Sequence, residues 1–387
     1  MQSAATDPAA PLGVACFANQ FGDAQGHGLA RYARELAEAL RQIDDLRIVP
    51  VAGWSSLAPE ALAERHGDIG LETTGLGRRG TSLLWTFLDR PTLESRISVP
   101  VDVVHAVSLG YPVATRKPFV VTIHDLGPLT QPHFFRNTRP WVMQRSLKQV
   151  VRKADAIVCV SQSTADEVRD YVGPAVDGRL RVVLEGVSEA FFDAPDPALL
   201  ASLDLPAQGT PFILSAGAIS PRKNVEGLLR AMIRLAREIP HHLVLVGGAG
   251  WDGGPIEAAL ADRALRGRVH SVGYVSDDQL RALYHAAELY VHPSLYEGFG
   301  LPVLEAMASG TPVLASDSTS LPEVVGQAGR LTDASDPDAL ARAIAEICGS
   351  PEGRAAMADR GRAHAATFRW SARARQMRDV YHDVAAS

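Results

Sequence analysis

Short apolar runs alternate with segments of helical periodicity along almost all of this 387-residue chain, and this alternation restricts the fold more than any other feature. Short apolar runs of this kind are typical of strands buried on both faces, and a helical segment between two of them connects them in parallel. We therefore predict an α/β protein with doubly wound parallel sheets. The predicted strands are Leu12–Ala18, Val101–Val107, Phe119–Ile123, Ala156–Val160, Leu180–Leu184, Phe212–Ala216, Leu243–Val246, Val269–Val272, Leu289–His292 and Pro312–Ala315.

The length of the chain suits two domains better than one ordinary hydrophobic core. The clearest boundary is the segment Asp193–Gly209, where Asp, Pro and Ala crowd together between two alternating blocks. We predict a Rossmann-like domain at residues 1–192, a second one at residues 193–365, and a C-terminal helix at residues 366–387 that packs back on the first domain. Ligands of such sheets bind at the carboxyl ends of the strands, so two facing sheets predict a cleft between the domains.

The composition excludes several classes of protein. A formal net charge of −6, spread along the chain, argues against a nucleic-acid-binding protein. The first eleven residues lack the features of a secretory signal, and no stretch reaches the roughly 20 apolar residues of a membrane-spanning helix. The three cysteines, Cys16, Cys159 and Cys348, lack the spacing of a metal site. We therefore expect buried, reduced thiols and a cytoplasmic protein.

The segment Ser294–Gly310, SLYEGFGLPVLEAMASG, carries the clearest chemical signal. It combines a strand end, a glycine-rich turn and the start of a helix. Gly298 and Gly300 would let the backbone approach a ligand, and the free N–H groups of the helix start would bind its oxygens. Glu297 and Glu305 can face one cleft, where carboxylates accept hydrogen bonds from sugar and ribose hydroxyls. Two solvated charges at a helix end are the simpler explanation of an isolated pair, but the flanking glycines weigh against it.

A second charged motif, SAGAISPRKN, follows the strand predicted at Phe212–Ala216. Arg222 and Lys223 would lie just before a helix that Asn224 caps. The positive end of a helix dipole disfavours cations, so two of them there indicate an anion that they bind together. A phosphate fits, because a guanidinium binds it in bidentate fashion. The alternative is a pair of ordinary surface cations.

The sequence EGFGLPVLE resembles the signature of the family-4 retaining glycosyltransferases, whose two Rossmann-like domains form the GT-B fold. The likeness continues through GTPVLASDSTSLPEVVG and SAGAISPRKN, and more weakly through TIHDL, VSQST and GLARYARELAEAL in the first half. TIHDL together with SPRKN looks most like bacterial mannosyl- and rhamnosyltransferases. One departure is Glu185, which stands where the family commonly has the Asn of an Asn-Gly-Val motif, so the contact of that Asn is not carried over.

The resemblance implies roles for individual residues. Arg222 and Lys223 would hold the diphosphate of a nucleotide-sugar donor, Glu305 its ribose, and Glu297 the transferred sugar. His124 would contribute from the first domain, although a lone histidine after an apolar strand is as often structural. The implied donor-binding residues are Gly28, Arg222, Lys223, Glu297, Gly298, Phe299, Gly300, Leu301 and Glu305, and the implied catalytic residues are His124, Arg222, Lys223 and Glu297.

The leading hypothesis is a retaining, metal-independent hexosyltransferase. It would move mannose from GDP-mannose to a glycan or a polyprenyl-diphosphate-linked saccharide in bacterial surface-polysaccharide synthesis. We expect no cofactor and no metal, since Asp336-Pro-Asp338 matches a metal–diphosphate motif but opens a predicted helix, where capping explains it. The alternatives are a UDP-sugar-using transferase and a catalytically weak regulatory subunit that binds sugar nucleotide. An NAD enzyme would use Gly248–Gly253, which lacks the acidic residue that should follow it.

The segment Phe134–Lys153 mixes aromatic and basic residues. One interpretation is a peripheral contact with an anionic membrane surface, on the inner face of the membrane, which would suit a lipid-linked acceptor. The simpler interpretation is a helix that packs on the core through Met143, Leu147 and Val150. Both hold if the outer face of this helix is basic.

Overall fold

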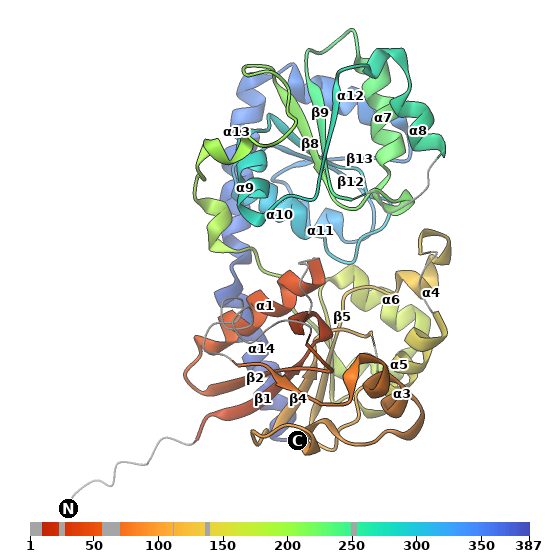
Figure 1. The fold of residues 1–387 in the computed structure, drawn as a ribbon, viewed down its shortest axis with the longest axis vertical. Coiled ribbons are helices and arrows are strands. Elements are labelled where there is room, and N and C mark those ends of the chain that lie inside the picture. The colour runs from red at the N-terminus through yellow and green to blue at the C-terminus, as the bar shows by residue number, and fades with distance from the viewer. Residues whose placement is uncertain (1–9, 23–27, 56–69, 111, 136–139, 249–253) are drawn as a thin grey trace, which may run out of the picture.

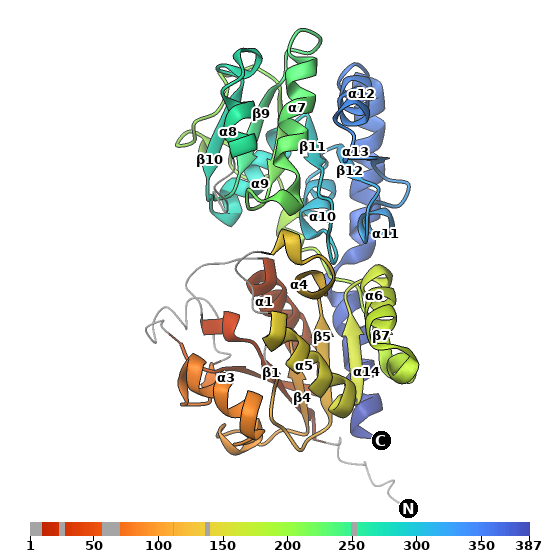
Figure 2. The ribbon, with the colours of Figure 1, turned by 90° about the vertical axis from the view of Figure 1, so that its right-hand side faces the viewer.

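The computed structural model describes residues 10–22, 28–55, 70–110, 112–135, 140–248 and 254–387. Two wholly parallel sheets lie one above the other along the long axis of the molecule (Figure 1), one from each half of the chain. Helices cover both faces of each sheet, as the turned view in Figure 2 also shows. The predicted doubly wound α/β architecture is confirmed.

The first sheet has the strand order β3-β2-β1-β4-β5-β6-β7. Its direction of winding reverses between β1 and β4, which is where ligands bind in such sheets. Its strands are β1 (Leu12–Phe17), β2 (Leu46–Ala52), β3 (Glu72–Thr73), β4 (Val103–Ala106), β5 (Phe119–Ile123), β6 (Ala156–Cys159) and β7 (Leu180–Val182). The helices of this half are α1 (Gly28–Arg41), α3 (Gly77–Leu88), α4 (Gly127–Thr130), α5 (Pro140–Lys153) and α6 (Gln162–Val172).

The second sheet has the order β10-β9-β8-β11-β12-β13, and its winding reverses between β8 and β11. Its strands are β8 (Phe212–Ala216), β9 (His242–Val246), β10 (Val269–Gly273), β11 (Leu289–His292), β12 (Val313–Ser316) and β13 (Arg330–Thr332). The helices that follow are α7 (Val225–Leu235), α8 (Gly254–Leu260), α9 (Asp277–Ala286), α10 (Leu301–Ala308), α11 (Leu321–Val325), α12 (Pro337–Cys348), α13 (Pro351–Ala365) and α14 (Trp370–Ala385).

The last helix, α14, returns to the first sheet and packs on α1, β4 and β5. It buries one face, which includes Met377 and Tyr381. His105 of β4 anchors it from inside the core, because its Nδ1 lies 2.8 Å from the Tyr381 hydroxyl and its Nε2 lies 2.8 Å from Thr122 Oγ1. Burial lowers the pKa of His105 to about 3, so the ring is neutral in this contact at physiological pH.

All ten predicted strands are present, within two residues at either end. The prediction missed β2, β3 and β13. The first contains Arg47 and Pro50, which interrupt its apolar run. Strand β3 has two residues, neither of them apolar, and β13 has three residues, of which only Leu331 is apolar. Such short or interrupted strands are recognisable only by their neighbours in the sheet.

The other local predictions that the described residues test are also confirmed. Asn224 caps α7 and Asp336 caps α12, each accepting a hydrogen bond from a main-chain N–H of the first turn. The three cysteines are buried and free. Residues 249–253 of the glycine motif lie outside the described residues. Within the described part of the chain, no helix is both long enough and apolar enough to cross a membrane.

Candidate active site

The two charged motifs lie together at the carboxyl edge of the second sheet. Arg222 and Lys223 follow β8, and Glu297 follows β11, the strand next to it. These two strands flank the point at which the sheet reverses its winding. The loops after them diverge there and leave space for a ligand.

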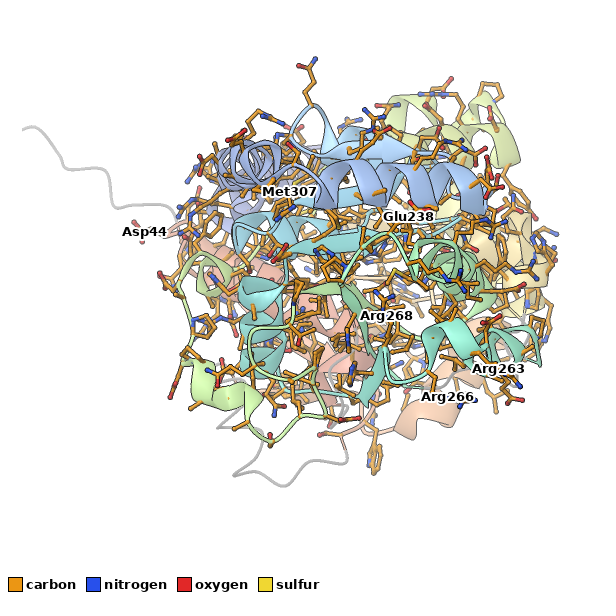
Figure 3. The ribbon with its side chains drawn as sticks, turned by 90° about the horizontal axis from the view of Figure 1, so that it is seen from above. Asp44, Glu238, Arg263, Arg266, Arg268 and Met307 are labelled. Atoms are coloured by element: carbon orange, nitrogen blue, oxygen red, sulfur yellow. The ribbon has the colours of Figure 1, made fainter. Side chains whose placement is uncertain are left out.

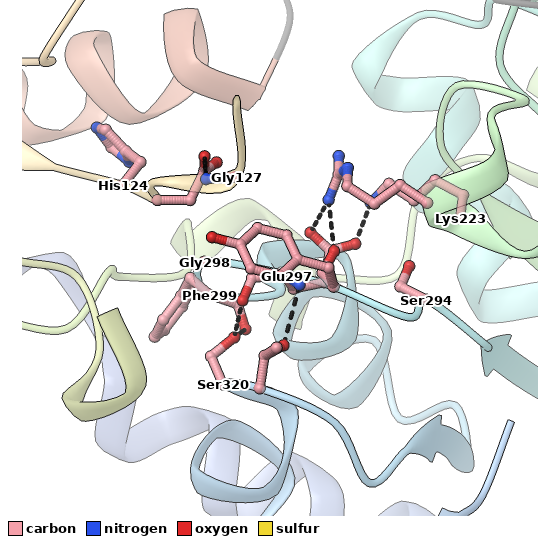
Figure 4. A network of polar contacts seen from close by, with 12 residues as sticks. His124, Gly127, Lys223, Ser294, Glu297, Gly298, Phe299 and Ser320 are labelled. Atoms are coloured by element: carbon pink, nitrogen blue, oxygen red, sulfur yellow. Dashed lines mark hydrogen bonds and ion pairs between the residues drawn. The ribbon is translucent and has the colours of Figure 1, made fainter. Parts of the chain in front are cut away.

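Glu297 is the centre of a buried charged cluster (Figure 4). Arg222 donates from Nη1 to its Oε2 at 2.6 Å, and Lys223 donates from Nζ to its Oε1 at 2.5 Å. His292 Nε2 lies 3.1 Å from the same Oε1. The main-chain N–H of Glu297 donates to Thr319 Oγ1 at 3.0 Å, and Glu297 as a whole is only 8% exposed. The loop after β8 and the end of β11 therefore meet on one carboxylate, and Thr319 holds the main chain of Glu297.

The charges of the cluster are strongly coupled. Burial alone would raise the pKa of Glu297, but Arg222 and Lys223 hold it well below its ordinary value. Burial lowers the pKa of Lys223, and the nearby carboxylate of Glu297 offsets only part of this shift. Burial would also lower the pKa of Arg222, but Glu297 holds it above its ordinary value. Two cationic side chains thus share one carboxylate, and the excess of positive charge suits an anionic group of a ligand.

Gly298 brings the turn after Glu297 into contact with the first half of the chain. A Cβ atom added here would lie 1.8 Å from the main-chain oxygen of His124. The Gly298 carbonyl accepts hydrogen bonds from Ser161 Oγ at 2.7 Å and Thr164 Oγ1 at 3.2 Å. The close approach of the two domains therefore requires a glycine at this position, a reason that the sequence did not reveal.

A second contact between the halves lies beside the first. The carboxylate of Glu323 accepts hydrogen bonds from the main-chain N–H groups of Gln162 and Ser163 at 3.0 and 3.1 Å. These groups belong to the first turn of α6, where a negative charge is favourable. The glycine turn and α11 of the second half thus both rest on the N-terminal end of α6.

The ring of His124 is fixed by groups of the first domain. Its Nδ1 lies 3.0 Å from Glu185 Oε1, and its Nε2 lies 3.0 Å from the carbonyl oxygen of Val107. Tyr32 packs edge-on against the ring at a centroid distance of 4.5 Å. The ring is directed away from Glu297 (Figure 4). Glu185, the residue that departs from the common motif, is therefore the partner that orients His124.

Glu305 lies on α10 and is 2% exposed. Its carboxylate pairs with Arg31 of α1 and accepts a hydrogen bond from the Tyr284 hydroxyl at 3.1 Å. Arg31 also pairs with Asp277. Burial alone would lower the pKa of Arg31, but Glu305 and Asp277 raise it above its ordinary value. Arg31 was missed in the sequence, since one cation on an amphipathic helix carries no sign of a partner 274 positions away.

The remaining predicted residues have different surroundings. Gly28 begins α1, and a Cβ atom there would meet nothing within 4 Å. Gly300 precedes α10 with a φ of 111°, which favours glycine. The side chains of Phe299 and Leu301 are buried, so only their main chains can face a ligand. Among the described residues, no group of three His, Cys, Asp or Glu side chains is placed to hold a metal ion.

A pocket of about 790 Å³ opens beside Glu297, between the two halves of the chain. Most of the residues that line it carry a carboxylate, an amide or a hydroxyl group, and they include Tyr171 and Tyr296. Among the described residues that line it, none is Lys or Arg. Its chemistry suits a neutral ligand rich in hydroxyl groups rather than a phosphate.

Known proteins are similar to this chain in architecture and in sequence. The family model of glycosyl transferases group 1 matches residues 204–364, and that of glycosyltransferase family 4 matches residues 26–191. O-antigen chain mannosyltransferase B of Escherichia coli is 31% identical over 358 residues, which cover 89% of this chain and 92% of that protein. The MMP alpha-(1->4)-mannosyltransferase of Mycolicibacterium hassiacum is 35% identical over 62% of this chain and 56% of its own length.

A solved structure supports the same fold. HepE of Anabaena, in complex with UDP and glucose, aligns with a TM-score of 0.74 and 17% identity over 96% of this chain and 100% of that one. Both halves of the chain thus match models of one enzyme group, and a relative similar along nearly its whole length is a glycosyltransferase. The chain belongs to the family-4, group-1 glycosyltransferases and has their two-domain GT-B fold.

Proposed function

We propose that this glycosyltransferase moves mannose from GDP-mannose, with retention of configuration and without a metal ion. The acceptor would be a glycan or a polyprenyl-diphosphate-linked saccharide of a bacterial surface polysaccharide, reached from the cytoplasm. The observation that carries the proposal is the pairing of Arg222 and Lys223 with Glu297 beside the glycine-rich turn. The choice of mannose is supported by the relatives, which are named as mannosyltransferases, one of them for the O-antigen chain.

The donor diphosphate would bind to Arg222 and Lys223, which then stabilise the negative charge that grows on it as its bond to the sugar breaks. Once the diphosphate pairs with Arg222 and Lys223 in place of Glu297, the Glu297 carboxylate can accept hydrogen bonds from the sugar hydroxyls. The acceptor hydroxyl attacks the anomeric carbon from the side of the leaving group and gives its proton to a departing phosphate oxygen. Because two cations already face the leaving group, we propose that no divalent metal is required.

His124 would line the donor-sugar end of the site from the first domain. Its partner Glu185 holds the ring by Nδ1 and Val107 holds it by Nε2, so it cannot turn without breaking one of these contacts. Because the ring is directed away from Glu297, it would contact the donor sugar only after exchanging one of these contacts for a sugar hydroxyl.

The acceptor saccharide would enter the pocket beside Glu297. This pocket is lined by Gln131 and Tyr171 as well as Glu297, and it continues from the place proposed for the transferred sugar. Amides bind hydroxyls, and an aromatic ring can pack against the apolar face of a sugar. A lipid-linked acceptor would leave its diphosphate and lipid outside this pocket, away from the carboxylates that line it.

The contact between Glu305 and Arg31 leads to a prediction about donor affinity. If Glu305 binds the ribose hydroxyls, Arg31 competes with the donor for this carboxylate. We expect Glu305→Ala to weaken GDP-mannose binding by about tenfold to a hundredfold, the typical loss for hydrogen bonds to a charged group. Arg31→Met should leave the affinity unchanged or tighter. Titration calorimetry measures both, and an equal weakening in the two variants would show that Arg31 is itself part of the donor site.

A donor screen tests the proposed function. Purified protein is titrated with GDP-mannose, UDP-glucose, UDP-GlcNAc, dTDP-rhamnose and NAD in the presence of EDTA. Nucleotide release is then followed with and without a mannose-terminated acceptor. We expect GDP-mannose to bind selectively, and GDP release in EDTA to require the acceptor. An α-linked product, identified by the one-bond carbon–proton coupling at its anomeric carbon, would support retention.

Each other outcome contradicts a defined part of the proposal. Selective binding of a UDP-sugar would replace the donor and keep the enzyme class. Release that needs added Mg²⁺ would contradict the metal-independent mechanism. Binding without release, with a series of acceptors, would favour a regulatory subunit. If NAD alone binds, the proposed function is wrong.

A further inference from the structure

Several exposed apolar side chains lie together on two neighbouring helices of the first domain. Leu83, Phe87 and Leu88 of α3 are 58%, 59% and 65% exposed, and Trp141 of α5 is 51% exposed. Among the described residues, nine large apolar side chains are exposed, and four of them are these. Such a concentration on a water-soluble surface marks a site of interaction rather than a random scatter.

The two helices form one surface. They lie side by side in Figures 1 and 2, at the outer side of the first sheet. Arg145 of α5 donates from Nε to the carbonyl oxygen of Thr86 at 2.6 Å, and its guanidinium lies 5.2 Å from the centroid of the Phe87 ring. At the end of α3, Asp89 pairs with Lys153. The apolar residues of α3 are therefore bordered directly by the cations of α5.

Within the bounds of the two helices, all charged residues are cationic. Neither the 12 residues of α3 nor the 14 residues of α5 include an Asp or a Glu. In sequence, α3 carries Arg78 and Arg79, and α5 carries the cations Arg145, Lys148, Arg152 and Lys153. The whole chain has a formal charge of −6, so positive charge is concentrated on these two helices while the rest of the chain has a net negative charge. The partner that such a surface attracts is negatively charged.

We propose that α3 and α5 form a docking face for a membrane surface that contains anionic lipids. The aromatic and aliphatic side chains of the face would enter the boundary between head groups and acyl chains, while the cations of α5 bind lipid phosphates. Long cationic side chains can lie along apolar surface and still keep their charged ends at the head groups. No membrane-spanning segment is needed for such a contact.

The structure also corrects the composition of this face. The sequence placed its aromatic part in Phe134–Lys153, but Phe135 is turned inward against Gly127 and Tyr296. On α5, Trp141 is the aromatic side chain that the described residues show exposed. More of the exposed apolar side chains come from α3, which the sequence analysis did not single out. The basic outer side of α5 is as expected, since Arg145, Lys148 and Arg152 are exposed whereas Leu147 and Val150 are buried.

The position of the face suits the proposed acceptor, an argument that rests on the proposed function. Helix α5 packs against α4, and Thr130 at the end of α4 lines the pocket beside Glu297. A molecule docked by this face would therefore hold the pocket close to the membrane surface. The saccharide of a lipid-linked acceptor could then reach the pocket while its lipid stays in the bilayer.

Sedimentation with vesicles tests the docking face without any substrate. The full-length protein is mixed with vesicles of phosphatidylcholine, or of phosphatidylcholine with about 30% phosphatidylglycerol as the probe. We expect binding only to the anionic vesicles, weakened by salt because the attraction is screened. The variants Phe87→Ser/Leu88→Ser and Lys148→Glu/Arg152→Glu should each bind at least about tenfold more weakly.

The control variants make the same kinds of substitution, apolar to serine and cation to glutamate, on the second domain. Leu260→Ser alters an apolar side chain that is 41% exposed. Arg263→Glu/Arg266→Glu reverses two exposed cations of the second domain, which Figure 3 labels. These controls should sediment like the wild type. Circular dichroism and GDP-mannose titration check that every variant is folded, and neither measurement depends on the membrane.

A second measurement locates the contact. Vesicles with brominated acyl chains quench tryptophan fluorescence only at contact with the lipid, and Trp141→Phe should remove most of the quenching. The proposal is wrong if the wild type ignores anionic vesicles, or if the control variants lose binding as much as the α3 and α5 variants. It is also wrong if the wild type is a dimer that Phe87→Ser/Leu88→Ser dissociates, because the face would then bind a second copy of the chain.

Discussion

The Lys223→Met variant is expected to lose about a hundredfold to a thousandfold in kcat for mannosyl transfer, the usual effect of removing one group that stabilises transition-state charge. Lys223 Nζ lies 2.5 Å from the Glu297 carboxylate, at the place proposed for the leaving diphosphate. Methionine keeps the length of the side chain and removes its charge. Initial rates of GDP release at saturating donor and acceptor measure the effect.

The matched control is Lys117→Met, which removes the same charge from an exposed site of the first domain. Its kcat should equal that of the wild type. If Lys223→Met stays within about threefold of the wild type, the departing diphosphate is stabilised by other groups and the proposed role of this cluster is wrong. A rise in KM with unchanged kcat would instead assign Lys223 to binding of the ground state.

The second large effect is expected for stability. Glu297→Gln keeps the shape of the side chain but leaves Arg222 and Lys223 buried without their shared carboxylate. Breaking a buried ion pair in this way costs about 3–5 kcal/mol. The corresponding fall in Tm is roughly 10 °C for a domain of this size. Scanning calorimetry at pH 7 measures it.

The effect should depend on pH in a defined direction. Because Arg222 and Lys223 hold the pKa of Glu297 well below its ordinary value near 4.5, the charged form stabilises the folded state fully above that value. This contribution is lost as the pH falls through the lower pKa of the folded state. The difference in Tm between the wild type and Glu297→Gln should therefore be largest near neutral pH and shrink below about pH 4.

Glu226→Gln provides the comparison for this prediction. Glu226 pairs with Arg230 one turn along α7, at the surface, where such pairs contribute about 0.5 kcal/mol or less. Its Tm should match that of the wild type at both pH values. A Tm difference for Glu297→Gln that does not change between pH 7 and about pH 3.5 would mean that loss of the charge is not its cause.

The two domains differ in how far the sequence predicted their details. In the second domain, the strand, glycine turn and helix around Glu297 were predicted together, because they are consecutive in the chain. The cap at Asn224 and the pair Arg222 and Lys223 were predicted for the same reason. Their meeting on Glu297 was not, since a motif shows which residues follow a strand but not which side chains touch across neighbouring strands.

In the first domain, α3 shows where periodicity fails. Its sequence GRRGTSLLWTFL has apolar residues on every side of its second half. Trp85 is fully buried, while Leu83, Phe87 and Leu88 are exposed. A helix that is apolar all round does not indicate which side faces the core. The α3 part of the docking face was therefore visible only once α3 had been placed beside α5.

The sequence alone determined the class of fold, the positions of most strands along the chain, the helix caps and the segments that carry the charged motifs. These follow from interactions between residues close together in the chain, such as burial at a regular period and hydrogen bonds of a cap to the next turn. The tertiary structure decided the pairing of Glu305 with Arg31, of His124 with Glu185, and of Gly298 with the main chain of His124. These contacts join residues that are 61 or more positions apart. The pairing of His124 with Glu185 depends on the folding of the first half of the chain, and the other two contacts exist only because the two sheets pack in one orientation.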